Sequence, residues 1–198
     1  MKEGESMKNM KKIIAVCGNA AVPEESINYK LAYETGKAII DHGYRMQCGG
    51  LDGVMLAACK GARASEKYTD GDIIGLLPSF NPKSANEYVD VIIPTGLDVF
   101  RNVIVASAAA VIAVGGGAGT LSEIANAWAL KRLIVGYKNA EGWSAKLADT
   151  RLDDRIRYPD IPEDRIYGVT DAESALQIID RYVERYDTYH MGITPGDK

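Results

Sequence analysis

Histidine is nearly absent from this sequence, since His42 and His190 are the only two among its 198 residues. Catalytic triads and zinc sites built on histidine place the imidazole beside a nucleophile, a carboxylate or further metal ligands. His42 falls at the end of a predicted helix, and His190 falls in the last residues of the chain. The sequence therefore argues against a histidine-based active site and predicts no metal site.

Cysteine is also scarce. Cys17, Cys48 and Cys59 form an odd set without the spacing of a metal site, so we expect reduced thiols rather than a disulfide framework. Cys17 and Cys48 both end predicted strands, where a thiol most simply serves as a small core residue. Nothing in the sequence places a base beside either of them.

No apolar run is long enough to cross a bilayer. Residues 1–12 are charged and lack the apolar core of a signal peptide. The chain also has no excess of basic residues, and its net charge of −4 argues against a nucleic-acid surface. We therefore expect a cytoplasmic protein that binds neither a membrane nor nucleic acid.

The composition is that of an ordinary globular protein, with 46% hydrophobic and 25% charged residues. A chain of this length buries a sizeable core, and α/β domains of this size are usually undivided. We predict a single Rossmann-like nucleotide-binding domain at 12–188, with flexible tails at 1–11 and 189–198.

Apolar strand-like runs alternate with helical patterns along the chain. Unbroken apolar strands between helices are typical of a parallel sheet that is buried on both faces. We therefore predict a three-layer, doubly wound α/β fold with a mainly parallel sheet and helices on both faces. The predicted strands are 12–17, 44–48, 72–77, 89–92, 108–114 and 133–137, and the predicted helices are 27–40, 54–64, 97–107, 121–130 and 171–186.

The most informative segment is the glycine-rich turn between a predicted strand and a predicted helix. Four glycines in five positions exceed what helix capping needs, and they let a backbone approach another molecule closely. The first amides of the helix are unpaired and carry partial positive charge, so phosphate is their natural occupant. The predicted binding residues are Gly115, Gly116, Gly117, Gly119 and Thr120.

Two further glycine turns follow predicted strands. In open parallel sheets, ligands bind beyond the carboxyl ends of strands where the strand order reverses. Three such turns on one sheet favour a nucleotide-like, phosphorylated ligand. The second and third sets of predicted binding residues are Gly18 and Asn19, and Gly49, Gly50, Asp52 and Gly53.

Residues 49–55 (GGLDGVM) and 116–123 (GGAGTLSE) resemble the paired motifs of the LOG superfamily, often labelled "lysine decarboxylase-like". Residues 17–19 and 74–78 also fall where that family keeps similar segments. The resemblance implies a ligand such as a nucleoside 5′-monophosphate, from which LOG enzymes release the base. A sister branch, whose motif begins with glycine, includes the molybdenum cofactor carrier proteins, and this branch implies a phosphorylated pterin as the bound ligand.

The match to the LOG enzymes is partial. Arg101 matches the arginine of their Arg-Lys pair, but Asn102 stands where the lysine would be. Gly115 replaces the first proline of their motif, and Ser122 replaces the first of two glutamates, whereas Glu123 matches the second. These departures favour the glycine-first branch, and they leave nucleoside monophosphate hydrolysis as the alternative.

Arg101 and Glu123 are the candidate catalytic residues. In a hydrolase, Arg101 would hold the phosphate, and Glu123 would stabilise positive charge on the ribose ring or orient water. In a binding protein, the same two side chains would only hold the ligand. The simpler alternatives are a surface ion pair of Arg101 with Asp98 and helix capping by Glu123. For Asn19 and Asp52 the alternative is a turn-forming role.

Two segments, 81–87 and 139–167, break the alternating pattern. The longer one alternates charges, and we expect a solvated insertion, although a loop over the ligand stays open. The resemblance also implies a homo-oligomer, either a dimer or a tetramer. A third possibility is an interaction module that has lost its ligand.

Overall fold

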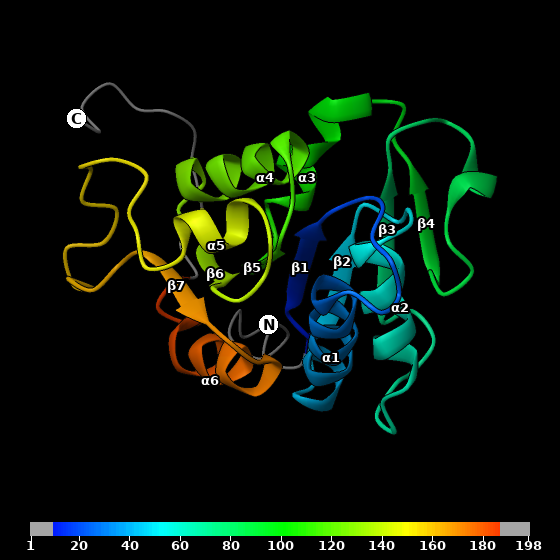
Figure 1. Cartoon of the computed structure of the whole chain (residues 1–198), viewed down its shortest axis with the longest axis horizontal. Coiled ribbons are helices and arrows are strands. Elements are labelled where there is room, and N and C mark those ends of the chain that lie inside the picture. Colours follow the sequence, from blue (N-terminus) through cyan, green and yellow to red (C-terminus); the bar gives the residue numbers. More distant parts are fainter. Residues whose placement is uncertain (1–9, 187–198) are drawn as a thin grey trace, which may run out of the picture.

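The computed structural model describes residues 10–186, and at its centre is a seven-stranded sheet with all neighbouring strands parallel (Figure 1). The strand order is β4-β3-β2-β1-β5-β6-β7. The predicted Rossmann-like α/β fold is thus confirmed, and the sheet is parallel throughout. The strands are β1 (Ile13–Gly18), β2 (Arg45–Cys48), β3 (Ile73–Leu77), β4 (Val91–Pro94), β5 (Ala110–Val114), β6 (Leu133–Tyr137) and β7 (Ile166–Val169).

Helices cover both faces of the sheet and complete the three layers (Figure 1). Alternate residues of each central strand enter two separate cores, one under each helical layer. In β5, for example, Ile112 belongs to one core and Val111 to the other, which explains why such strands are continuous apolar runs. One layer holds α1 (Ile27–Asp41), α2 (Val54–Arg63) and α6 (Ala172–Tyr182), and the other holds α3 (Asn102–Val105), α4 (Ala118–Ala129) and α5 (Trp143–Leu147).

Local sequence explains how these helices begin and pack. Ser26 caps α1 and Asp171 caps α6, because each side chain accepts a hydrogen bond from a backbone N–H of the first turn. α1 and α2 pack closely at a glycine. A Cβ added at Gly36 would lie 1.9 Å from the carbonyl oxygen of Ala58, so no larger residue fits there.

The strand order reverses at β1, which lies between β2 and β5. Gly18 at the end of β1 is the register partner of Val114 at the end of β5. The turns that follow these two strands therefore leave the sheet side by side, at the position where open parallel sheets bind ligands.

The prediction of a solvated insertion at 139–167 holds only in part, because most of its charged side chains are exposed but one pair is buried and regular elements lie within it. α5 lies within this segment, and β7 begins at Ile166. Arg157 and Asp164 form a buried ion pair with 2.5 Å between Nη2 and Oδ1, and the Arg157 guanidinium lies 3.7 Å from the centroid of the Trp128 ring. A run of alternating charges does not predict that Arg157 is buried, because the Trp128 ring that covers it lies in another part of the sequence.

Smaller differences concern the boundaries of elements. The predicted helix 97–107 consists of a 3-10 turn, η2 (Asp98–Arg101), followed by the short helix α3. A second 3-10 turn, η1 (Pro82–Ser84), lies in the irregular segment 81–87. α4 begins at Ala118, three residues before the predicted start. His190 and most of the two predicted tails lie outside the described residues.

Candidate functional site

The first half of the glycine-rich turn is buried and bonded to the protein itself. Gly115 N donates to Ser144 Oγ, and Gly116 N donates to Asn19 Oδ1, each at 2.8 Å. Both glycines have positive φ values, +67° and +97°, which side-chain-bearing residues adopt only with strain. Asn28 Nδ2 also donates to Asn19 Oδ1, at 3.2 Å. These two amides are therefore satisfied without any ligand.

The second half of the turn is exposed. Within residues 10–186, the first helical hydrogen bond of α4 runs from Leu121 N to Gly117 O, no side chain caps the helix, and the amides of residues 118–120 have no acceptor. A Cβ added at Gly117 or at Gly119 would meet nothing within 4 Å. The start of α4 thus offers free donors, partial positive charge and open space, which is the combination that binds a phosphate.

Arg101 and Glu123 meet beside this helix start, although they are 22 residues apart in sequence. Arg101 Nη1 lies 3.4 Å from Glu123 Oε1, and the two residues are only 8% and 6% exposed. The alternatives of a surface ion pair with Asp98 and of helix capping by Glu123 are therefore both wrong. Arg101 Nε is buried without a hydrogen-bond partner among the described residues, so one charged donor of this pair remains unsatisfied.

Burial changes the protonation of this cluster. Desolvation raises the pKa of Glu123 to about 7, against the opposing effects of Arg101 and of the Cys17 thiol. Burial, with the charge of Glu123, raises the pKa of the Cys17 thiol. Cys17 is thus a neutral thiol packed against the carboxyl group. Glu123 exchanges its proton near neutral pH, and perturbed carboxyl groups of this kind are frequent at functional sites.

Asn102 and Ser122, at two positions that differ from the LOG enzymes, contact each other. Asn102 Nδ2 donates to Ser122 Oγ at 2.7 Å, and Ser122 Oγ donates to the carbonyl oxygen of Gly119 at 2.7 Å. The pair ties α3 to the first turn of α4. Where the enzymes carry a lysine and a glutamate, this chain has a neutral hydrogen-bonded link.

The glycine turn 49–53 packs against the other two parts of the site. Gly50 and Gly53 have positive φ values, +70° and +64°. Val54 N donates to the carbonyl oxygen of Asn19 at 2.9 Å, and a Cβ added at Gly49 would lie 2.5 Å from Arg101 Nη2. Asn19 therefore links all three predicted turns. It lies in the turn after β1, its side chain accepts from Gly116 in the turn after β5, and its backbone accepts from Val54 at the end of the 49–53 turn.

The remaining predicted residues have differing surroundings. Thr120 is buried, and its side chain lies over Gly116, where an added Cβ would be 2.2 Å from Thr120 Oγ1. A Cβ added at Gly18 would lie 2.4 Å from the carbonyl oxygen of Val114, so this glycine permits close packing of β1 and β5. Asp52 is exposed and lines a hollow of about 540 Å³ formed with residues 20–24 of the loop before α1.

Sequence reasoning missed three side chains that hold the site. Ser144 accepts from Gly115 N, and Asn28 donates to Asn19 Oδ1. Asn86 Nδ2 donates to the carbonyl oxygen of Leu51 at 2.9 Å. Asn28 also accepts from Glu141 N at 3.1 Å. No local motif marks these residues, because each one acts on a segment that is distant in sequence.

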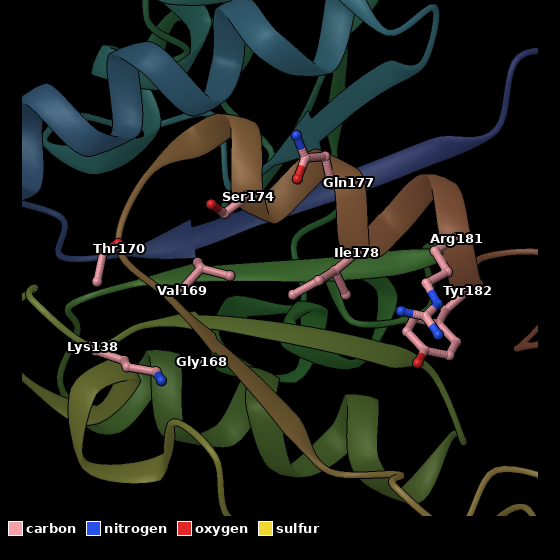
Figure 2. Close-up of a pocket in the computed structure, with 9 residues that line it drawn as sticks. All are labelled: Lys138, Gly168, Val169, Thr170, Ser174, Gln177, Ile178, Arg181 and Tyr182. Atoms are coloured by element: carbon pink, nitrogen blue, oxygen red, sulfur yellow. The ribbon is translucent and has the colours of Figure 1, made fainter.

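A second hollow, of about 380 Å³, lies between β7 and α6. Figure 2 shows that α6 lines one side of it, with Ile178 and Tyr182 among the side chains, and that Lys138 follows β6 on another side. Lys138 is paired with Asp149 at 2.5 Å. None of the predicted site residues lines this hollow. Free backbone donors therefore distinguish the carboxyl ends of β1 and β5 as the candidate site.

The described residues contain neither a metal-binding cluster nor a membrane-spanning helix. Between residues 10 and 186, no three or more His, Cys, Asp or Glu side chains are placed to hold a metal ion together. In the same part of the chain, no helix has the length and apolarity needed to cross a membrane.

Two solved structures of molybdenum cofactor proteins are similar to this chain. The molybdenum cofactor binding protein of Rippkaea orientalis is 30% identical with a TM-score of 0.69, over 88% of this chain and 99% of that one. The molybdenum cofactor carrier protein of Chlamydomonas reinhardtii is 29% identical with a TM-score of 0.67, with the same coverage of both chains.

Sequence comparisons agree with this structural likeness. An uncharacterised protein of Archaeoglobus fulgidus is 40% identical over 113 residues, which are 57% of this chain and 70% of that protein. The pattern of the SLOG cluster4 family matches residues 11–164, which include all three glycine turns and the Arg101–Glu123 pair. The chain therefore belongs to the SLOG cluster4 family.

Proposed function

We propose that this protein binds a phosphorylated, nucleotide-like small molecule at the carboxyl ends of β1 and β5. The observation that carries this proposal is the open half of the glycine-rich turn, where the amides of residues 118–120 lack acceptors and no side chain fills the space. A phosphate would satisfy these donors and complement the helix dipole. Of the predicted binding residues, Gly115 and Gly116 anchor the turn, and those of the open half and of the other two turns remain part of the proposal.

The buried ion pair supplies the second element of recognition. Arg101 keeps one unsatisfied donor, and a guanidinium binds phosphate oxygens through charged hydrogen bonds. Glu123, with its pKa near 7, can donate to an acceptor or accept from a donor, such as a sugar hydroxyl or the polar edge of a ring. The pair thus fits a ligand in which a phosphate is followed by polar groups.

A phosphorylated pterin is the ligand that the similarity to molybdenum cofactor proteins supports. We therefore propose that the chain carries such a cofactor as cargo in the cytoplasm. The neutral link between Asn102 and Ser122 favours a carrier, because it occupies two positions at which the LOG enzymes have charged side chains.

Hydrolysis of a nucleoside 5′-monophosphate is the second candidate. It is favoured by the contact between Arg101 and Glu123, since cleavage of an N-glycosidic bond builds positive charge that a carboxylate stabilises. Incubation with a panel of nucleoside monophosphates tests it. Release of free base that is lost in Glu123→Gln would establish the hydrolase and contradict a pure carrier.

We also propose that the protein is a homo-oligomer, as the family resemblance implies. Large apolar side chains are exposed along the stretch from β4 through η2 to α3, and we call this group the β4–α3 surface: Val91, Ile92, Ile93, Leu97, Val99, Phe100, Val103 and Ile104. β4 is also an edge strand of the sheet. Exposed apolar patches of this kind mark protein interfaces.

Light scattering after size-exclusion chromatography tests the oligomer. Phe100→Glu is expected to give monomers, because it places a charge on the β4–α3 surface. Ile156→Glu is the matched control, since Ile156 is 73% exposed and Phe100 is 76% exposed, but Ile156 lies outside that surface. A monomeric wild-type protein would refute the proposal.

Ligand binding is tested by native mass spectrometry of the purified protein, and by titration with inorganic phosphate and with AMP. Gly119→Glu places a carboxylate in the open space beside the free amides, and its matched control is the uncharged Gly119→Gln. We expect the glutamate to weaken phosphate binding about tenfold more than the glutamine does, because like charges repel. Equal binding by both variants, or no binding by the wild type, would contradict the proposal.

A further inference from the structure

Two thiols are in contact directly behind the 49–53 turn. Cys48 ends β2 and Cys59 lies on α2, and their Sγ atoms are 3.6 Å apart. Both side chains are fully buried in one core cluster, whereas Cys17 belongs to the other. A disulfide bond of about 2.05 Å requires these two sulfur atoms to approach by about 1.5 Å.

Hydrogen bonds connect the same sulfur atoms to the turn. Gly50 N donates to Cys48 Sγ at 3.3 Å. Asn86 Nδ2 lies 3.7 Å from Cys59 Sγ and also donates to the carbonyl oxygen of Leu51. The backbone N–H of Asn86 donates to the carbonyl oxygen of Gly50 at 2.9 Å. A change at either sulfur atom therefore changes how the turn is held.

The two thiols differ in acidity. A hydrogen bond from the Cys59 thiol, supported by the Gly50 N–H, lowers the pKa of Cys48. The same hydrogen bond, together with burial, raises the pKa of Cys59. The thiolate is the reactive form of cysteine, so Cys48 is the attacking group of the pair.

We propose that Cys48 and Cys59 are a redox modification site, which forms a reversible disulfide and thereby resets the 49–53 turn of the ligand site. The expected effect on ligand binding rests on the proposed function, whereas formation of the disulfide does not. The oxidant is a small-molecule disulfide, such as oxidised glutathione, and its attack by the buried Cys48 requires the turn to open.

The reaction balances in two exchange steps. Cys48 loses its proton and attacks one sulfur of the small disulfide, which forms a mixed disulfide and releases one thiolate that takes up the proton. Cys59 then loses its proton and attacks the Cys48 sulfur, which releases the second small thiol. In sum, two protein thiols are oxidised to one disulfide, and one small disulfide is reduced to two thiols.

The consequence for the site follows from the position of Gly49. Its backbone lies against the Arg101 guanidinium so closely that an added Cβ would be 2.5 Å from Nη2. In the disulfide, the Cys48 sulfur has moved toward Cys59 and no longer accepts from Gly50 N in the same geometry. The turn then shifts beneath Arg101, and we expect weaker phosphate binding by the oxidised protein.

The test incubates the native full chain with oxidised glutathione and maps disulfides by peptide mass spectrometry. A parallel sample is refolded from urea in a glutathione redox buffer, so that burial of the thiols does not prevent reaction. We expect a Cys48–Cys59 disulfide in both samples, reversed by dithiothreitol. In Cys59→Ala, we expect one glutathione to remain on Cys48. Three free thiols in both wild-type samples would overturn the proposal.

Two readouts separate this inference from the proposed function. Hydrogen exchange at the Gly50 amide needs no ligand, and we expect it to be at least tenfold faster in the oxidised protein. Inorganic phosphate should bind several-fold more weakly after oxidation, and Cys17→Ala, the control for disulfide formation alone, should still form the bond. Unchanged exchange at Gly50 would refute the resetting of the turn. A reduced protein that binds no phosphate would refute the proposed function instead.

Discussion

The two halves of the glycine-rich turn after β5 each contain two glycines but have opposite surroundings. Gly115 and Gly116 are buried, have positive φ values, and bond to Ser144 and Asn19. Gly117 and Gly119 are exposed, and an added Cβ at either of them would touch nothing. The first half anchors the turn to the protein, and the second half leaves backbone donors for a ligand. A glycine-rich motif is therefore not uniformly a binding site.

The largest expected effect is that of an alanine in the anchored half. Gly116→Ala combines a φ of +97° with an added Cβ 2.2 Å from Thr120 Oγ1. We expect a loss of about 4 kcal/mol in the free energy of unfolding, from backbone strain and steric overlap together. Urea denaturation measures this loss. A loss in the free energy of unfolding below about 1 kcal/mol would contradict the conclusion that the first half of the turn is more constrained than the second.

The open half leads into the buried Glu123, whose ionisation links stability to pH. Its folded pKa of about 7 lies above the ordinary value of 4.5. The contribution of the protonated Glu123 side chain to the free energy of unfolding is therefore fully present below pH 4.5 and is lost as the pH rises through 7. At 1.36 kcal/mol per pKa unit, this group lowers the free energy of unfolding by about 3 kcal/mol over that interval.

Glu123→Gln should remove this part of the pH dependence, which urea denaturation at several pH values reveals. Glu66→Gln is the matched control, because Glu66 is an exposed glutamate beyond the carboxyl end of α2, away from the glycine turns. If the Glu123→Gln variant keeps the wild-type slope between pH 4.5 and 7, then the carboxyl group is not buried as described.

A smaller loss is expected when the anchor itself is removed. Asn19→Ala leaves the buried Gly116 N–H without its acceptor, and an unsatisfied buried donor costs about 2 kcal/mol. Phosphate affinity should fall as well, since the open half then loses its support. Unchanged stability in a urea titration would show that another group or a water molecule replaces the asparagine.

The smallest effect has the opposite sign. Gly119 lies in the first turn of α4 without positive φ, and a Cβ there has space. Gly119→Ala should therefore raise the free energy of unfolding by about 0.5 to 1 kcal/mol, because alanine is the better helix former. Thermal denaturation is a sufficient measurement. Destabilisation instead would show that the open half is as constrained as the anchored half.

The elements with a strong local pattern were the ones that sequence predicted well. Continuous apolar runs indicated β1, β5 and β6, and a helical pattern indicated α6. The segment 139–167 was not predictable in this way. Arg157 of this segment is buried through its contacts with Trp128 and Asp164, and neither contact follows from the order of charges in the segment.

The sequence by itself determined the parallel α/β fold and the three glycine turns at strand ends, because these depend on periodicity and on residues adjacent in the chain. Tertiary structure alone decided which amides of the turn stay free, that Arg101 meets Glu123, and that Cys48 touches Cys59. Each of these depends on how distant segments pack around β1. Packing brings together residues that are far apart in the sequence, so the local sequence does not predict these contacts.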